Sequence, residues 1–222
     1  MIKQIPNLLT PQEISQLKEM AASAQFVDGR ISNPHSKVKK NLHLHDDTAG
    51  DQSAQLLETA LMRHEDFRNF AFPVGITAPI LTKYEAGMRY GLHPDSAIMV
   101  VQGKTFRTDL SCTIFLNDPA SYEGGALRML FGDSQMRFKG QPGSAVIYPS
   151  TTLHEVEEVT SGERLVGLCF IQSRIADTAR RNLLYELNEV AALEGLGMSD
   201  ANYTRLQSVQ FNLLRMWMEG EG

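Results

Sequence analysis

The densest group of potential metal ligands lies in NLHLHDD, residues 41–47, which holds two of the six histidines of this 222-residue chain. On an extended strand, His43 and His45 would share one face, as two metal ligands could, and a following aspartate could add an oxygen. Three lysines precede this segment between residues 37 and 40, and such a cationic run disfavours a bound cation. The pattern therefore favours a solvated or substrate-facing strand over a metal site.

A sparser pair, His93 and Asp95, lies in the segment YEAGMRYGLHPDSA, residues 84–97. A spacing of two residues places both side chains on one face of an extended backbone. Imidazole combined with carboxylate suits Fe(II) or Mn(II). The pair alone is weak evidence, because HPD also fits a simple turn in which the proline restrains the preceding residue.

A third candidate ligand follows in the segment GSAVIYPSTTLHEV, where His154 comes after an expected strand and a proline-containing turn. Asp95 and His154 are 59 residues apart, which is long enough for several strands of a sandwich to bring them together. Two histidines and one carboxylate would form a facial triad, which leaves open positions on an iron ion.

Ten residues after His154, Arg164 opens the apolar segment RLVGLCFIQ. It is in phase with alternate apolar residues of that strand, so its side chain should point inward with theirs. A buried arginine needs a counter-charge, and its planar guanidinium suits a carboxylate held through two hydrogen bonds. The alternative is an arginine at a strand end, paired with one of the glutamates of residues 155–158.

Helices are expected at both ends of the chain. Thr10, Pro11 and Glu13 form a capping box that begins a helix running to about Ala24. Residues 28–50 are polar and are expected to be loop with one strand, and a second helix is expected over about 51–69. Near the C-terminus one helix presents a leucine-rich stripe from residue 183 to 191, and Ser199 can cap a last helix.

From about residue 78, eight short β-rich runs follow one another, separated by glycine, proline and asparagine turns. The runs are PILTKY, SAIMVV, RTDLSCTIFLN, GALRMLF, QMRFKG, GSAVIYP, LHEVEEV and RLVGLCFIQ. They predict a mainly β fold with flanking helices and a double-stranded β-helix, or jelly roll, at its core. Residues 101–109 form a candidate lid or substrate loop, although a plain exposed connection fits them equally well.

The expected organisation is an N-terminal helical and loop region over residues 1–77, a jelly-roll domain over 78–174 and a helical extension over 175–222. The formal net charge of −5 argues against binding to nucleic acid. No apolar run is long enough to span a membrane, and the N-terminus lacks a signal-peptide pattern. Cys112 and Cys169 fall in apolar runs, which predicts buried thiols, and a cytoplasmic protein is expected.

At these residues the chain resembles bacterial PKHD-type hydroxylases of the iron-uptake-factor PiuC-like branch, a family of Fe(II)/2-oxoglutarate-dependent dioxygenases. The matching segments are YEAGMRYGLHPDSA, RTDLSCTIFLNDP, YEGGAL, YPSTTLHEV and GERL. The resemblance extends over nearly the whole chain, from IPNLLTPQEI near its start to LLRMW near its end. The NLHLHDD segment is not among the ligand motifs of this family.

The resemblance implies that His93, Asp95 and His154 hold Fe(2+) and that Arg164 binds the distal carboxylate of 2-oxoglutarate. Tyr84 matches a tyrosine that, in similar prolyl hydroxylases, hydrogen-bonds the same carboxylate, although a packed strand residue would fit its position equally well. The implied reaction uses O2 to hydroxylate a C–H bond and converts 2-oxoglutarate to succinate. Ascorbate is implied as an accessory reductant.

The substrate stays open among a peptidyl proline or lysine, a free amino acid and an iron-chelating metabolite. One alternative function is a non-catalytic jelly-roll module that binds an iron chelate or a protein partner. Another is a metallohydrolase with a metal-bound water, which would need no equivalent of Arg164. The C-terminal helices could cover a face of the barrel or form a homodimer interface.

Overall fold

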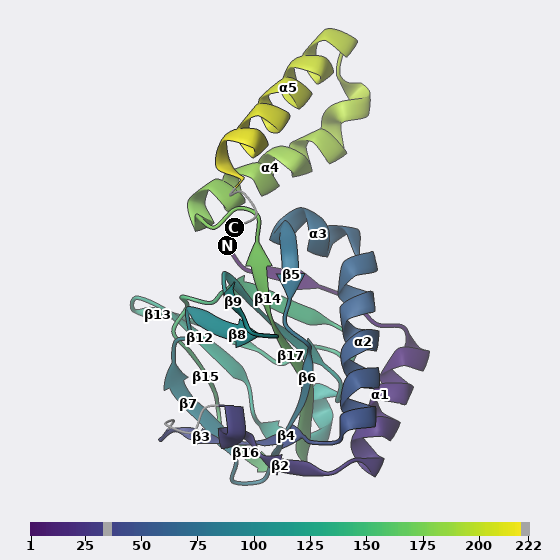
Figure 1. Ribbon diagram of the computed structural model, residues 1–222, viewed down its shortest axis with the longest axis vertical. Coiled ribbons are helices and arrows are strands. Elements are labelled where there is room, and N and C mark those ends of the chain that lie inside the picture. The colour runs from purple at the N-terminus through teal and green to yellow at the C-terminus, as the bar shows by residue number, and fades with distance from the viewer. Residues whose placement is uncertain (33–36, 219–222) are drawn as a thin grey trace.

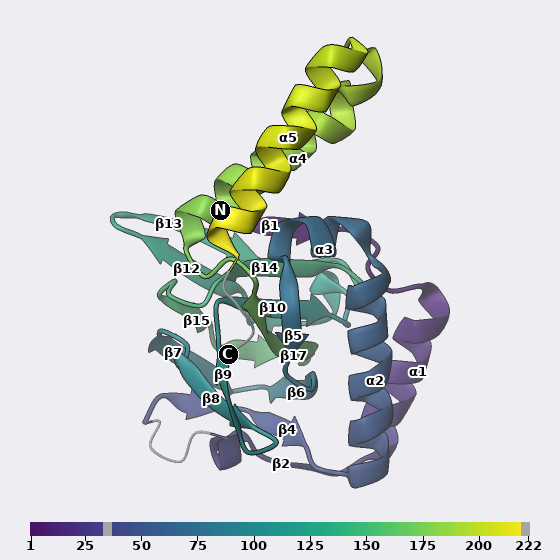
Figure 2. The ribbon, with the colours of Figure 1, turned by 45° about the horizontal axis from the view of Figure 1, so that its top comes forward.

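The computed structural model describes residues 1–32 and 37–218. Its centre is a jelly-roll sandwich of two antiparallel β-sheets, as the sequence predicts (Figure 1). Three helices cover the outer face of the larger sheet, and a hairpin of two long helices projects beyond one end of the sandwich (Figures 1 and 2). Among the described residues, no helix is long and apolar enough to cross a membrane.

Four strands of the larger sheet come from residues 1–77, so this region contributes to the sandwich as well as to the helices that cover it. Strand β5 (Pro73–Ile76) also pairs with β17. The remaining strands, in spatial order, are β1 (Lys3–Ile5), β14 (Ala145–Pro149), β10 (Leu110–Phe115), β17 (Glu163–Ser173), β6 (Ile80–Glu85), β4 (Leu42–Leu44) and β2 (Phe26–Asp28).

The smaller sheet has five strands and closes the other side of the sandwich. Two short ribbons flank it: β11 (Glu123–Gly124) with β16 (Val159–Ser161), and β8 (Ile98–Val101) with β9 (Lys104–Arg107). The second ribbon spans most of residues 101–109, so this segment is a hairpin with a tight turn rather than a plain loop. In spatial order the five strands are β13 (Ser134–Phe138), β12 (Leu127–Phe131), β15 (His154–Val156), β7 (Arg89–His93) and β3 (Lys39–Lys40).

Strand β17 separates two hydrophobic cores. Leu165, Cys169 and Ile171 pack toward the helices, whereas Val166 and, in the same phase, Arg164 face the smaller sheet. Because both faces of this strand are buried, its central residues, 165–171, are all apolar. Gly167 lies under α2 (Asp47–Arg63), where an added Cβ would come within 2.9 Å of the Leu57 side chain.

The two cysteines lie directly opposite each other on β10 and β17, on the face that the helices cover. Both are buried and both are free thiols, as the apolar sequence around them predicts. They contribute to the packing of the larger sheet as small apolar side chains.

Helix α1 (Pro11–Ser23) begins with the expected capping box, in which Thr10 and Glu13 each accept a hydrogen bond from the backbone of the other. The second expected helix is divided into α2 (Asp47–Arg63) and α3 (Glu65–Ala71). His64 adopts an extended backbone between them, and the change of direction brings Phe67 and Phe70 into the core.

The chain ends in α4 (Thr178–Glu194) and α5 (Asp200–Trp217), joined by a short 3-10 turn at Gly195–Gly197. Asp177 caps α4 through the backbone N–H of Arg180. Ser199 occupies the expected N-cap position of α5, but its side chain makes no capping hydrogen bond. The other 3-10 turns are Gly29–Ser32 and Pro119–Ser121.

The capping box gives a pH-dependent prediction. The Arg63 guanidinium, followed by the Thr10 backbone N–H, lowers the pKa of Glu13 to about 2 against the opposing effect of burial. A depressed carboxyl pKa stabilises the fold above the pKa of the unfolded chain, near 4.3, and this stabilisation is lost as the pH falls toward 2.

Replacing Glu13 by Gln should lower the free energy of unfolding by about 1 kcal/mol at pH 7, because it removes the charge that pairs with Arg63 while a glutamine can still cap the helix. The difference from the wild type should vanish between pH 4 and pH 2, as measured by urea unfolding. The exposed Glu58 on α2 provides the control, since Glu58→Gln should leave stability unchanged at either pH. A Glu13→Gln deficit that stays constant down to pH 2 would contradict the assignment.

Candidate metal centre

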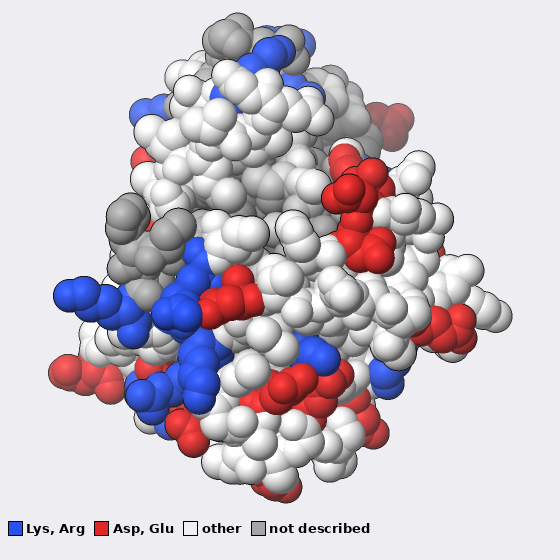
Figure 3. All heavy atoms as spheres, turned by 60° about the horizontal axis from the view of Figure 1, so that its bottom comes forward, with Lys and Arg blue, Asp and Glu red and all other residues white. Residues whose placement is uncertain are grey.

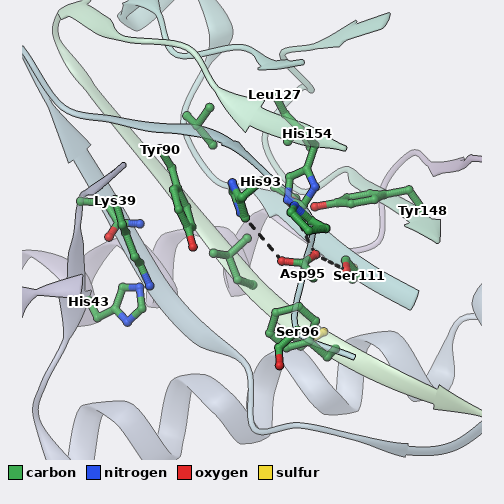
Figure 4. Close-up of a pocket in the computed structure, with 18 of the residues that line it drawn as sticks. Lys39, His43, Tyr90, His93, Asp95, Ser96, Ser111, Leu127, Tyr148 and His154 are labelled. Atoms are coloured by element: carbon green, nitrogen blue, oxygen red, sulfur yellow. Dashed lines mark hydrogen bonds and ion pairs between the residues drawn. The ribbon is translucent and has the colours of Figure 1, made fainter. Parts of the chain in front are cut away.

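His93, Asp95 and His154 converge on one point between the two sheets (Figure 4). His93 ends β7 and His154 begins β15, and the antiparallel register pairs these two residues directly. Asp95 follows two residues after His93, and its backbone N–H donates to the carbonyl of Ser150. The pairing of two neighbouring strands thus brings together residues that are far apart in sequence.

The ligand atoms of the three side chains all lie within 4.8 Å of one another. The Asp95 carboxylate oxygens are 3.9 Å from Nε2 of His93 and 3.7 Å from Nε2 of His154. Each Nδ1 is 2.7 to 2.9 Å from a backbone carbonyl, that of Gly91 for His93 and that of Thr152 for His154. These carbonyls favour protonation at Nδ1, which leaves the lone pair of each Nε2 available to a metal ion.

Two serines orient the carboxylate. Ser111 on β10 donates to Oδ2 of Asp95 at 2.5 Å, and its hydroxyl lies 2.8 Å from that of Ser150. Second partners of this kind fix the direction of a metal-binding carboxylate. Neither serine was expected from the sequence, because only the pairing of β10 with β14 brings them beside Asp95.

Aromatic rings hold the two imidazoles. Tyr90 stacks on His93 with 3.6 Å between ring centroids, and Tyr148 meets His154 edge-on at 5.1 Å. Burial, followed by the proximity of His154, lowers the pKa of His93 to about 4. His93 is therefore neutral at pH 7, which is the form that binds a metal ion.

Arg164 is buried on β17, with only 1% of its surface exposed, and points into the same space as the triad. Its guanidinium lies over the ring of Tyr84, at 5.0 Å. The expected alternative partners are engaged elsewhere, since Arg128, Arg137 and Arg89 pair with the glutamates of residues 155–158. Within the described residues, Nε and Nη1 of Arg164 have no hydrogen-bond partner.

Gly125, from the segment YEGGAL, leaves room for this arginine. Its φ of 63° is in the left-handed region, and an added Cβ would come within 3.2 Å of Cδ of Arg164 and 3.1 Å of the Tyr122 ring. A glycine here therefore serves both the backbone conformation and the close approach of the arginine side chain.

Tyr84 lies opposite Arg164 in the strand register, and its hydroxyl accepts a hydrogen bond of 2.9 Å from the side-chain amide of Asn41. Burial raises the pKa of Tyr84, so the phenol stays protonated and can donate to a ligand. Asn41 was missed from the sequence, although it is the first residue of the histidine-rich segment.

The NLHLHDD segment is not part of the His-Asp-His group. Its residues Leu42–Leu44 form β4, on which His43 is buried beside the cavity, whereas His45 is exposed. Asp46 is the N-cap of α2, where its side chain accepts from the backbone N–H of Ala49. The segment thus combines a strand that lines the cavity with the start of a helix.

One cavity of about 450 Å³ connects all these groups, from His93, Asp95 and His154 to Arg164 and on to His43. A dicarboxylate the size of 2-oxoglutarate fills only part of such a volume. The hairpin β8–β9 forms part of its wall, through Ile98, Met99 and Val100.

Comparisons with known proteins agree with this geometry. Residues 79–172 match the family model described as the 2OG-Fe(II) oxygenase superfamily. A PKHD-type hydroxylase of Sphingopyxis alaskensis is 57% identical over 95% of this chain and 96% of its own length. Another, from Shewanella sp. strain MR-4, is 36% identical over 99% of this chain and all of its own length.

A solved prolyl hydroxylase from Trichoplax adhaerens, in complex with a hypoxia-inducible-factor peptide fragment, shares the fold. Its TM-score is 0.60 at 15% sequence identity, over 82% of this chain and 86% of that one. The sandwich that surrounds the His-Asp-His group is thus the jelly roll of known 2-oxoglutarate oxygenases. The chain belongs to the 2OG-Fe(II) oxygenase superfamily and, within it, to the PKHD-type hydroxylases, which are Fe(II)- and 2-oxoglutarate-dependent dioxygenases.

Proposed function

We propose that His93, Asp95 and His154 are the iron ligands of this dioxygenase. The observation that carries this assignment is the convergence of two imidazoles and one carboxylate beside a buried arginine with unused N–H groups. Two Nε2 atoms and one carboxylate are the donor set that non-haem Fe(II) oxygenases use. Ser111 and the two backbone carbonyls hold these donors in place before the metal binds.

Arg164 and Tyr84 would bind the distal carboxylate of 2-oxoglutarate. Nε and Nη1 of Arg164 are buried N–H groups without a partner among the described residues, and a carboxylate oxygen is the acceptor that a guanidinium bonds most strongly. Asn41 positions the Tyr84 hydroxyl from the opposite side. The metallohydrolase and binding-module alternatives give no role to a buried arginine with two such donors.

The activity is hydroxylation of a C–H bond in a small molecule or a peptide. Iron, O2 and 2-oxoglutarate together supply the oxidising power, and 2-oxoglutarate leaves as succinate and carbon dioxide. The chain orients the substrate, excludes water and fixes the cosubstrate in the cavity. Ascorbate is proposed as the reductant that restores Fe(II), and the two free thiols fit a cytoplasmic enzyme.

The metal assignment predicts the effects of histidine replacements. His93→Ala should abolish the binding of Fe(II), because it removes one of three protein ligands. His43→Ala combined with His45→Ala should leave one iron per chain, as measured by metal analysis after anaerobic reconstitution. Loss of iron from the double variant, with retention in His93→Ala, would place the metal in the NLHLHDD segment instead.

The cosubstrate assignment predicts a spectroscopic result. Anaerobic addition of Fe(II) and 2-oxoglutarate together should give a metal-to-ligand charge-transfer band that neither gives alone. Arg164→Met should raise the Kd of 2-oxoglutarate roughly a hundredfold or more, because two charged hydrogen bonds are lost. Arg128→Met, which removes an arginine paired with Glu155, should leave this Kd unchanged. An unchanged Kd in Arg164→Met would refute the assignment.

We also propose that the α4–α5 hairpin forms a homodimer. The hairpin stands clear of the sandwich (Figures 1 and 2), and α5 has no fully buried residue. Leu183 and Val190 of α4 are 60% and 44% exposed, and Val209 and Met216 of α5 are 50% and 72% exposed. Each pair is spaced seven residues apart and therefore lines one side of its helix.

The contacts between the two helices place both pairs on the same side of the hairpin. Gln210 bonds to Leu187 and Asn188, and Trp217, seven residues on, lies by Arg180. Val209 and Met216 directly precede Gln210 and Trp217, so both lie on the same side of the line along which α4 and α5 touch, which we call the seam. The exposed α4 pair flanks the seam on that side too, because the helices run in opposite directions.

Charge complementarity supports a second copy as the partner of this face. Beyond its first turn, α4 carries Glu186, Glu189 and Glu194 and no basic residue. Beyond its first residue, α5 carries Arg205 and Arg215 and no acidic one. A two-fold axis along the hairpin would set each acidic α4 across from a basic α5 of the other copy.

Light scattering across a range of protein concentrations tests this interface. The wild type should have the mass of a dimer, and Leu183→Glu with Val190→Glu should give a monomer, because the two carboxylates would be buried without partners. Thr204→Glu with Ser208→Glu adds the same charge to the opposite side of α5 and should leave the dimer intact. A wild-type protein that stays monomeric at all concentrations would exclude the proposed homodimer.

A further inference from the structure

The unsatisfied polar atoms of the cavity extend well beyond Arg164. In the described part of the chain, six buried side-chain nitrogen or oxygen atoms have no hydrogen-bond partner. Five of them belong to residues on, or next to, three neighbouring strands. Nε and Nη1 of Arg164, Oδ1 of Asn41 and Nε2 of His43 belong to residues that line the cavity, whereas Oγ1 of Thr82 belongs to one that does not. An unsatisfied buried polar atom costs about 1–3 kcal/mol, so this concentration marks a ligand site.

The strand registers place these residues on one inner surface. Thr82 of β6 lies opposite His43 of β4 and, on its other side, opposite Val166, two residues from Arg164. Alternate residues of a strand share a face, so all of them turn toward the interior of the sandwich. The carboxylate of 2-oxoglutarate accounts for the unpaired N–H groups of Arg164, whereas His43 lies two strands away, on β4.

The segment that carries His43 crosses from one sheet to the other. Lys39 pairs with Tyr90 in the smaller sheet, and three residues later Leu42 pairs with Lys83 in the larger sheet. The segment therefore closes one open side of the sandwich and lines the cavity from both directions. Figure 4 shows Lys39 and His43 at the end of the cavity away from Asp95, with Tyr90 in between.

This end of the cavity is cationic. Lys39 is 8% exposed and lies 5.4 Å from the centroid of the Tyr90 ring. Burial lowers the pKa of Lys39 to about 8, which still leaves most of it protonated at pH 7. Burial, then the charge of Lys39, lowers the pKa of His43 to about 4, so His43 is neutral and can donate one N–H.

Basic residues also surround the outside of the crossing segment, although the chain as a whole carries a net charge of −5. Lys37, Lys40 and Arg89 are exposed and line a groove beside β3. Figure 3 views the molecule from this end and shows Lys and Arg side chains gathered along one side. Glu155, Glu157 and Glu158 line the same groove, so the cationic group nearest the cavity is the buried Lys39 rather than this outer surface.

We propose that Lys39 and His43 form a second anion subsite, which binds a carboxylate of the substrate while Arg164 holds 2-oxoglutarate. The substrate class is therefore a carboxylate-bearing molecule. This inference rests on the proposed placement of 2-oxoglutarate, because that placement assigns the first anion position to the cosubstrate. A neutral, apolar substrate would leave Nε2 of His43 without a partner even in the complete complex.

Iodide, an anion visible by its anomalous scattering, tests the subsite without knowledge of the substrate. Crystals of the protein loaded with Mn(II) and 2-oxoglutarate would be soaked in sodium iodide. An anomalous peak should appear within contact distance of Nε2 of His43 and Nζ of Lys39. The peak should disappear in Lys39→Met and persist in Lys40→Met, since Lys40 is exposed and donates to the carbonyl of Gly87.

The same maps separate this inference from the proposed function. Density for 2-oxoglutarate at Arg164 without iodide at His43 would overturn the second subsite alone, and so would a peak that persists in Lys39→Met. Density for 2-oxoglutarate against Lys39 and His43 would overturn both assignments. Iodide at His43 in crystals that hold 2-oxoglutarate at Arg164 is the expected result.

Discussion

The antiparallel pairing of β7 with β15 is the interaction on which the rest of the centre depends, because it sets His154 directly opposite His93. Neither strand is long, and each is held by its other neighbour: β15 by β12, and β7 by β3. The imidazoles are then fixed by the carbonyls of Gly91 and Thr152, which lie two residues before each histidine in the same strands or their turns. A metal ion would thus meet donors whose orientation is set by backbone hydrogen bonds, so little side-chain entropy remains to be lost on binding.

The larger sheet holds a buried cation, the guanidinium of Arg164, in an apolar interior. Arg164 lies on β17, whose alternate residues serve two separate cores, and its position between Tyr84 and Phe115 supplies aromatic faces for the guanidinium. These contacts offset only part of the cost of desolvation. Buried polar atoms on or beside β17, β6 and β4 therefore stay without hydrogen-bond partners within the residues that the structure describes. The packing of helices α1 to α3 against the other face of the sheet stabilises the fold enough to tolerate them. Ligand binding and stability are coupled in such an arrangement, since a ligand that satisfies these atoms also stabilises the folded chain.

Much of the centre could be predicted from the sequence because its signals are local. The His-x-Asp spacing, the later histidine and the phase of Arg164 within an apolar strand all survive in the structure, as does the capping box at Thr10. The crossing segment could not be predicted, because β3 and β4 contain only two and three residues and owe their form to pairing with β7 and with β6 and β2. The break between α2 and α3 allows Phe67 and Phe70 to be buried in the core, and the helical period of the sequence alone does not reveal it. Asn41 and Ser111 lack any motif, since their roles come from neighbours that are distant in sequence.

The ribbon β8–β9 pairs only with itself within the described sheets and borders the cavity through Ile98, Met99 and Val100. Its turn at Gln102 and Gly103 faces open space, where even an added Cβ at Gly103 meets no atom within 4 Å. A ribbon of this kind can change in length or side chains during evolution without altering the strands that carry the metal ligands. A change in this ribbon can therefore alter which molecules enter the cavity while the residues of the His-Asp-His group stay the same. Chains with the same reaction can differ in their substrates in this way.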